Sequence, residues 1–360
     1  MRRNKNEVVI VTYNRLSLLK ECIDAVLQQT IPFYKVIIVD NCSTDGTGEY
    51  LQQFENDDLF HIIHEKENLG GAGGFYDGMS VALADAPDWL LIIDDDAIIE
   101  PDYVEKLLKY ATNHGDHAAL AGKVVTDGKI DASHRRRVTN KKLFIETPVS
   151  LDEYKLGSFP CDTATFCGLM INGRALQQVG LPKREYFLWY DDTEYSLRLG
   201  EFQSRRYPQL EQTLSDYREE LTRLNHVGSE VSEIVRVPKL KARLGKGKSG
   251  IMVIPEATLN HKTKLPEAKK GILDRTDWRM YYGYRNRLDT AKNHFGPISA
   301  MCIRWEYTVF SVISHLQLLV PSKASHAGFN IRLLRRAKHD GSFGKLGKNR
   351  HYLPGGNADK

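Results

Sequence analysis

The first half of the chain repeats one format: a short apolar run, a polar turn, and then a segment with helical spacing. Apolar runs rich in Val, Ile and Leu lie at residues 8–14, 35–40, 60–64 and 89–94. Between the first two runs, apolar residues recur every three or four positions, as in an amphipathic helix: Leu18, Leu19, Cys22, Ile23, Val26 and Leu27. Strands that alternate with helices in this rhythm predict an α/β fold, with a mostly parallel central sheet and helices on both faces.

Polar clusters stand at the carboxyl ends of three of these predicted strands. "TYNR" follows the first strand, "VDNCSTD" the second, and "DDD" the strand at residues 89–94. In such sheets, ligands bind in the crevice outside the carboxyl ends of the strands. We therefore expect one pocket to collect all three clusters.

Three consecutive carboxylates, Asp94, Asp95 and Asp96, lie between two apolar runs. Like charges at the end of a buried strand repel one another and lose water, so such a cluster is tolerable only with a cation or several donors against it. The alternative is an acidic loop that faces solvent. If a divalent cation is present, oxygen ligands favour Mg²⁺ or Mn²⁺ over zinc, and such an ion usually holds phosphates. A leaving diphosphate and a separate carboxylate base together indicate group transfer.

A glycine-rich stretch, "NLGGAGGFYDGM" at residues 68–79, precedes that strand. Its glycines allow the backbone to approach a ligand closely, although a flexible turn at the start of a helix is the alternative interpretation. The spacing Gly-x-Gly-x-x-Gly is absent after the first strand, which argues against a Rossmann dinucleotide site.

A second acidic group, "DDTE", begins at Asp191 and follows the aromatic run Tyr186 to Tyr190. Aromatic walls raise the pKa of a carboxylate by desolvation, which suits a general base. The alternative is an acidic helix N-terminus favoured by the helix dipole. Arg198 follows Glu194 by four residues, so a helical ion pair is expected.

Between these motifs and the C-terminus, three features remain open. The basic run at residues 134–137, "HRRR", is either a solvated loop or an acceptor contact. Residues 201–250 form an excursion in which a helix at residues 208–225 is expected to pack its leucines on another surface, such as a second subunit. A strand ending at His261 places that histidine within reach of the carboxylates, or the histidine is structural.

The C-terminal region is predicted to be helical, with segments at residues 277–295 and 298–320. The second segment is apolar over much of its circumference and precedes a basic stretch. It forms either an interfacial anchor on anionic lipid or a helix packed on the main domain with a solvated tail. No apolar run approaches the roughly 20 residues needed to span a bilayer.

The amino-acid composition narrows the functional classes and cellular locations that remain open. A formal charge of +4 is too mild to indicate nucleic acid binding. Five cysteines without a CxxC pair favour reduced thiols in the cytoplasm, and no cleavable leader is visible in the first residues.

At this point the sequence resembles a known family. "VTYNR", "VDNCSTDGT", "DDD" and "YDDTEYSLR" are similar to the pattern of family 2 glycosyltransferases with the GT-A fold, over about residues 6–295. "NLGGAGGFYDGM", the triple Asp and "HKT…WRMYYGYRNR" most resemble bacterial galactofuranosyltransferases. The resemblance implies a GT-A domain at residues 1–295, with an insertion at about 201–250, and a helical, basic C-terminal region at 296–360.

The resemblance also implies roles for individual residues. A metal ion, Mn²⁺ or Mg²⁺, is expected on Asp94, Asp96 and His261. The general base is expected to be Asp192, with Asp191 orienting the acceptor or capping the following helix. The residues expected to bind the donor are Thr12, Asn14, Arg15, Asp40, Asn68, Gly70, Gly71 and Asp95.

The implied reaction inverts the anomeric carbon in a single displacement. The expected donor is UDP-galactofuranose, and the acceptor is a hydroxyl of a cell-surface glycan or of a lipid-linked oligosaccharide precursor. A dTDP-rhamnose-dependent rhamnosyltransferase is the alternative. Two other classes stay open: a nucleotidyltransferase, although "TYNRLSLL" supplies no basic, glycine-rich phosphate loop, and a non-catalytic sugar-binding module. We expect a cytoplasmic protein, peripheral on the inner face of the cell membrane, that does not bind nucleic acid.

Overall fold

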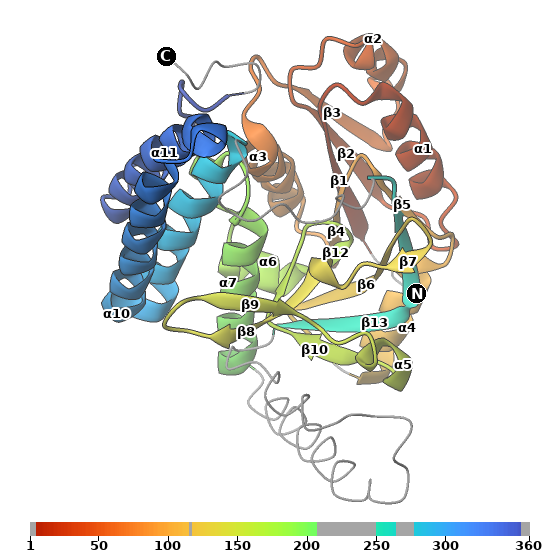
Figure 1. The fold of residues 1–360 in the computed structure, drawn as a ribbon. Helices are drawn as coiled ribbons and strands as arrows, with labels where there is room; N and C mark the ends of the chain where they lie inside the picture. Colours follow the sequence, from red (N-terminus) through yellow and green to blue (C-terminus); the bar gives the residue numbers. More distant parts are fainter. Residues whose placement is uncertain (1–4, 115–116, 207–249, 264–276, 354–360) are drawn as a thin grey trace, which may run out of the picture.

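The computed structural model describes residues 5–114, 117–206, 250–263 and 277–353. In this part of the chain, a central sheet is covered by helices, and a smaller sheet and a helical C-terminal region adjoin it (Figure 1). The helix expected at residues 208–225 lies outside the described residues.

Four neighbouring strands form the parallel part of the central sheet, in the order β4-β1-β2-β3. Their bounds are β1 Asn6–Thr12, β2 Lys35–Asp40, β3 Phe60–His64 and β4 Trp89–Asp94. Thr12 lies opposite Asp40 on β2, and Val11 lies opposite Asp94 on β4. The polar clusters therefore lie along one edge of the sheet, as the sequence predicted.

The rest of the central sheet is mixed. Strand β12 pairs antiparallel with β4 and β6, β13 pairs parallel with β6, and β10 pairs antiparallel with β13. Short strands β5 and β7 pair with β13 and β6. The bounds are β5 Ala97–Ile99, β6 Ala119–Thr126, β7 Lys129–Ile130, β10 Phe159–Cys161, β12 Leu169–Asn172 and β13 Ile251–His261. The predicted strand ending at His261 is confirmed, and its register places His261 opposite Ala97, the residue directly after the three aspartates.

Helices cover both faces of the sheet because successive strand residues point to opposite sides. Val8 and Ile10 pack with α1 and α4, whereas Val9 and Val11 pack with α3, α6 and α7. The bounds of the helices are α1 Leu16–Leu27, α2 Thr47–Leu51, α3 Gly70–Asp85, α4 Tyr103–His114, α5 Glu153–Leu156, α6 Gly173–Val179 and α7 Asp191–Arg206. The predicted α/β fold class is thus confirmed.

Helix α3 lies so close to β1 that its glycines are required. A Cβ at Gly74 would stand 2.6 Å from the Val11 side chain, and one at Gly78 would stand 2.5 Å from the Val9 side chain. The glycine-rich stretch is therefore a helix packed on the sheet, and the flexible-turn interpretation is wrong.

A three-stranded antiparallel sheet, β11-β8-β9, contains the basic run. Its strands are β8 Arg135–Asn140, β9 Ile145–Pro148 and β11 Thr163–Ala164. Arg135 is buried and donates to the carbonyl oxygens of Gly122 at 3.1 Å and Cys167 at 2.9 Å. Arg137 is buried and forms a bidentate pair with Glu153, at 2.8 and 2.7 Å. The solvated-loop interpretation of these arginines is wrong, because both are desolvated and fully engaged in structural bonds.

The C-terminal region consists of α10, Arg279–Gln317, and α11, Ala324–Ser342, which lie side by side at the edge of the molecule (Figure 1). Gly296, with φ 82° and ψ −174°, divides α10 into two segments, as the sequence predicted. The division into domains at residue 295 remains a prediction. Among the described helices, none combines the length and apolarity needed to span a membrane.

Candidate active site

The acidic tract Asp94–Asp96 is held by side chains from other elements. Thr12, at the end of β1, donates a hydrogen bond of 2.8 Å from its Oγ1 to Asp95 Oδ2. Arg15, before α1, places Nη1 3.2 Å from Asp95 Oδ1 and 2.7 Å from Asp96 Oδ2. Because Asp95 and Asp96 are both buried, the interpretation of this tract as a solvent-facing loop is wrong.

His261 reaches the same tract from β13. Its Nε2 lies 3.3 Å from Asp96 Oδ1, and Thr263 donates from Oγ1 to Asp96 Oδ2 at 2.6 Å. The His261 ring also packs edge-on against the ring of His134, with centroids 4.9 Å apart. The structure therefore brings Asp96 and His261 together, and it adds His134, which the sequence had placed only in the basic run.

The three carboxylates differ in their pKa values. Burial, followed by the charges of Asp96 and Asp95, raises the pKa of Asp94 to about 8. Burial raises the pKa of Asp95 to about 6, although the Arg15 charge opposes the shift. Burial acts on Asp96 in the same direction, but His261, Thr263 and Arg15 together outweigh it and hold the pKa of Asp96 below its usual range. The tract therefore ionises completely only with more positive charge beside it.

The donor set at this tract fits a hard divalent cation. Carboxylate oxygens with one imidazole nitrogen are ligands that Mn²⁺ and Mg²⁺ accept. Asp96 Oδ1 is buried and receives no well-aligned hydrogen bond. Across the described residues, however, no three His, Cys, Asp or Glu side chains are already gathered as a metal centre. The positive charge beside Asp95 and Asp96 comes from the Arg15 guanidinium.

A cavity of about 280 Å³ lies beside this tract, at the carboxyl ends of β1, β2 and β4. Asp94 lines it, together with six of the residues predicted to bind the donor: Thr12, Arg15, Asn68, Gly70, Gly71 and Asp95. Residues outside the predicted donor set also line it: Tyr13, Asn41, Phe187, Leu188, Trp278 and Arg279. The expected single pocket at the strand ends is thus present.

Two of the predicted donor residues, Asn14 and Asp40, do not line the cavity and instead shape the loop after β2. Asn14 Oδ1 accepts from the Thr44 backbone N–H at 2.7 Å. Asp40 is buried, and its Oδ1 accepts from the Ser43 backbone N–H at 2.9 Å. The cavity is reached from this loop by Asn41, whose side chain accepts from Leu69 N–H and donates to the Gly70 carbonyl oxygen.

The second acidic group begins helix α7. Asp191 is buried, and burial followed by the Asp192 charge raises its pKa to about 8. Asp192 is half-buried, and burial raises its pKa, while the Arg136 charge opposes that shift. Neither carboxylate lines the cavity, but Phe187 and Leu188, a few residues before them, do.

The aromatic loop that joins the cavity wall to the acid pair has an unusual backbone. Phe187, Trp189 and Tyr190 have φ values of 64°, 63° and 69°. Bulky residues rarely adopt positive φ, and each such residue stores about 1–2 kcal/mol of strain. Gly70 touches this loop so closely that a Cβ there would stand 1.9 Å from the Phe187 carbonyl oxygen. The loop therefore needs support from the surrounding structure.

That support comes from Arg285 and Asn286, two buried residues of α10. Asn286 Nδ2 donates to the carbonyl oxygens of Tyr186 at 3.0 Å, Leu188 at 3.0 Å and Trp189 at 2.8 Å. Arg285 Nη2 donates to the Tyr186 carbonyl oxygen at 2.9 Å. The only sequence signal for these residues was the motif "YRNR" amid aromatics, which does not show what the side chains bind.

The first half of the chain matches a known protein family. Residues 7–172 match the family model described as glycosyl transferase family 2. Over these residues the chain is similar to family 2 glycosyltransferases. The matched residues include the three aspartates and most of the cavity wall, whereas the acid pair and His261 follow further along the chain.

Curated proteins that are similar to this chain include two with sugar-specific names. Galactofuranosyltransferase GlfT1 of Mycolicibacterium smegmatis is 27% identical over 53% of this chain and 64% of its own length. The dTDP-rhamnosyl transferase RfbF of Shigella flexneri is 29% identical over 53% of this chain and 61% of its own length. In eight of the curated relatives with which it aligns, the chain covers between 15% and 64% of their length.

Among solved structures, the chain resembles GalNAc-T7 with UDP, GalNAc and Mn²⁺. The TM-score is 0.53 at 12% identity, over 94% of this chain and 57% of that chain. The likeness shows the fold alone, and it confirms the GT-A type expected from the sequence.

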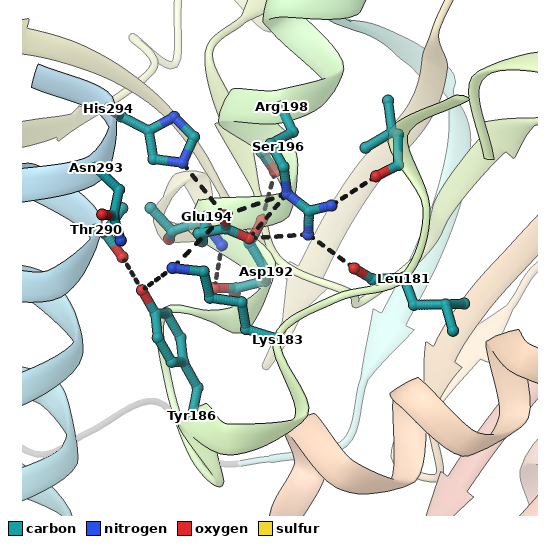
Figure 2. A network of polar contacts seen from close by, with 12 residues as sticks. Leu181, Lys183, Tyr186, Asp192, Glu194, Ser196, Arg198, Thr290, Asn293 and His294 are labelled. Atoms are coloured by element: carbon teal, nitrogen blue, oxygen red, sulfur yellow. Dashed lines mark hydrogen bonds and ion pairs between the residues drawn. The ribbon is translucent and has the colours of Figure 1, made fainter. Parts of the chain in front are cut away.

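Glu194, the third acid of the second group, belongs to the framework of the fold. Figure 2 shows it between Arg198, Lys183 and His294 of α10, with closest contacts of 2.9, 3.9 and 3.3 Å. Contacts with these partners together outweigh burial and lower the pKa of Glu194. The predicted ion pair with Arg198 is confirmed, and the network fastens α7 to α10.

Proposed function

We propose that this protein is an inverting, metal-dependent glycosyltransferase that moves galactofuranose from UDP-galactofuranose to an acceptor hydroxyl. The observation that carries the proposal is the convergence of the acidic tract, Arg15 and His261 beside one cavity at the strand ends. The diphosphate of a nucleotide-sugar donor is negatively charged and needs positive charge beside it in the cavity. An acid-rich site next to the cavity can supply that charge by binding a divalent cation.

The proposed donor contacts follow from the cavity wall. Thr12 and Arg15 hold Asp95 in place, and Asp95 faces the donor sugar. Asn68, Gly70 and Gly71 supply a wall without bulky side chains, at the start of α3. Asn14 and Asp40 contribute to the nucleotide end through the loop that they shape.

The metal part of the proposal assigns Asp94, Asp96 and His261 as the residues that would hold Mn²⁺ or Mg²⁺. When bound, the ion would neutralise the negative charge of the departing diphosphate. GalNAc-T7, which has a related fold, was solved with UDP and Mn²⁺.

The chemical step is a direct displacement. The acceptor oxygen forms a bond to the anomeric carbon while the bond from that carbon to the diphosphate oxygen breaks. The hydroxyl proton passes to the carboxylate of Asp192, and the diphosphate leaves from the opposite face, so the configuration inverts. A positioned general base contributes roughly 10² to 10⁴-fold to such a step. Asp191 then orients the acceptor or stabilises the start of α7.

The identity of the donor sugar rests on similarity. GlfT1 supports galactofuranose, and RfbF supports dTDP-rhamnose to a comparable degree, so the rhamnosyltransferase is the second candidate. The acceptor is proposed to be a cell-surface glycan or a lipid-linked precursor. The protein would then act in the cytoplasm, in peripheral contact with the inner face of the cell membrane.

A panel of nucleotide sugars, with Mn²⁺ or Mg²⁺ and with excess chelator, tests the proposal by release of nucleoside diphosphate. We expect release with UDP-galactofuranose that depends on the metal ion. Release of inorganic diphosphate from a nucleoside triphosphate would instead indicate a nucleotidyltransferase. Sugar binding without release under any condition would indicate a non-catalytic module. The anomeric configuration of the product, read by NMR, tests inversion.

A further inference from the structure

The second segment of α10, after Gly296, presents an apolar face to solvent. Six of its exposed or outward residues recur at intervals of three or four, which places them along one side of a helix: Ile298, Met301, Trp305, Val309, Val312 and Leu316. We name these six residues the α10 apolar face. Trp305 is 70% exposed, and beyond the helix end Leu319 is 80% exposed. Twenty helical residues extend the face over about 30 Å.

The exposure of this face is a property of a well-anchored helix. On the opposite side of the same segment, Ser299, Ile303, Tyr307 and Ser314 are buried. Tyr307 donates from its hydroxyl to the Tyr284 carbonyl oxygen at 2.9 Å, and its ring packs on the Tyr284 ring. The segment is therefore fixed in rotation, and the apolar residues cannot turn inward without losing these contacts. Apolar patches of this extent mark interaction surfaces.

Positive charge accompanies the α10 apolar face. Exposed Arg304 adjoins Trp305 in sequence, and Lys338 of α11 reaches across to Thr308 Oγ1 at 3.2 Å. Residues 297–350 contain nine Lys and Arg and only two acids, Glu306 and Asp340.

Both acids in that range are already neutralised. Glu306 pairs with Arg287 at 2.9 Å, and Asp340 pairs with Arg336 at 2.8 Å. Within these described residues, the surface around the face therefore offers cations to a partner and no unpaired carboxylate. An anionic partner with an apolar interior complements it, whereas a second copy of the same surface would bring like charges together.

We propose that the α10 apolar face lies flat on an anionic bilayer, with its side chains at the boundary of headgroups and acyl chains and its cations on the phosphates. This proposal rests on the proposed function, because a lipid-linked acceptor would lie at the same bilayer surface and give the contact its purpose. The contact itself is measurable without any turnover.

The test is vesicle flotation of the full chain with Trp305→Ser and Leu316→Ser combined. A matched control removes two exposed leucines elsewhere, Leu151→Ser and Leu156→Ser. Vesicles of equal parts phosphatidylglycerol and phosphatidylcholine are compared with pure phosphatidylcholine. We expect the unaltered chain and the control to bind the anionic vesicles alike, and the double variant to bind at least about tenfold less. Binding to pure phosphatidylcholine should be weaker for all three.

Three further readouts make the result decisive. Thermal unfolding midpoints should agree among the three proteins, because all four replaced side chains are exposed. Equal vesicle binding by the double variant and the unaltered chain would overturn the proposal, as would absence of binding by the unaltered chain. If light scattering showed a dimer that the double variant dissociates, without vesicle binding, the occupant would be a second copy and the proposal would also fail. Sugar transfer to a soluble acceptor, measured in parallel as release of nucleoside diphosphate, separates failure of this proposal from failure of the proposed function.

Discussion

Replacing Asn286 by alanine tests whether α10 holds the aromatic loop in the shape that the acid pair needs. The single amide group of Asn286 donates to three backbone carbonyl oxygens of that loop. The amide has two N–H groups, so one of them is shared between two carbonyl oxygens. These two donors and the bond that Asn286 Oδ1 accepts from Arg285 Nε contribute about 1 kcal/mol net each, so the replacement should lower the free energy of unfolding by about 3 kcal/mol. The strain of the positive-φ residues then favours relaxation of the loop toward ordinary backbone angles.

Relaxation should affect catalysis more than folding. The loop leads directly into Asp191 and Asp192, and a misplacement of about 1 Å of a reacting group costs on the order of 10²-fold in rate. We therefore expect kcat of Asn286→Ala to fall at least about 10²-fold, measured at saturating donor and acceptor and corrected for the folded fraction. Donor KM should rise as well, because Phe187 and Leu188 line the cavity.

Asn293→Ala is the matched control. Asn293 lies on the same helix, is exposed, and donates one hydrogen bond of 3.1 Å to Asp289. It should change stability and kcat little. If Asn286→Ala lost about 3 kcal/mol of stability but kept a normal kcat per folded molecule, the loop would not position the base, and this reasoning would be refuted.

Three further predictions concern the carboxylates. Asp192→Asn should lower kcat about 10² to 10⁴-fold with donor binding nearly unchanged, and if Asp191→Asn is the inactive variant instead, their roles are exchanged. Since burial raises the pKa of Asp192, the base form is lost on acidification at a higher pH than for an exposed aspartate. In a pH–rate profile, Arg136→Gln should therefore move the acid limb of kcat/KM to higher pH, because the Arg136 charge lowers that pKa, and Glu146→Gln should move it to lower pH. Excess chelator should abolish turnover, and Asp96→Ala should remove metal-dependent binding of the nucleoside diphosphate by calorimetry; full activity in chelator would contradict the metal assignment.

The strand ends were predictable because two local signals coincide there. An apolar, β-branched run fixes the strand, and the first carboxylate or amide after it fixes its end. These signals place Thr12, Asp40 and Asp94 along one edge of the sheet, and the pairing of β1 with β2 and β4 agrees. Which side chain at the end of β2 reaches the cavity was not predictable, because the loop contacts that hold Asp40 and Asn41 are made only in the folded chain.

The buried arginines and the strained loop carried no such signal. A charged run such as "HRRR" usually faces solvent, and the partner that neutralises Arg137, Glu153, is sixteen residues away without a linking pattern. Aromatic residues at positive φ are rare enough that sequence propensity argues against them. The tertiary contacts of Arg285 and Asn286 support that backbone, so the loop could not be foreseen from its own residues.

For the second segment of α10, each of the two interpretations of the sequence describes one face of the helix. Apolar residues around most of a helix indicate burial on all sides, and the sequence left a packed helix and an interfacial anchor equally open. In the structure, Ile303 and Tyr307 lie in the core, so the packed-helix interpretation is right for the inward face. Trp305 and Leu316 face outward from the same helical segment. The apolar side chains of the outward face leave water only if that face also contacts an apolar medium. The proposed bilayer contact supplies such a medium.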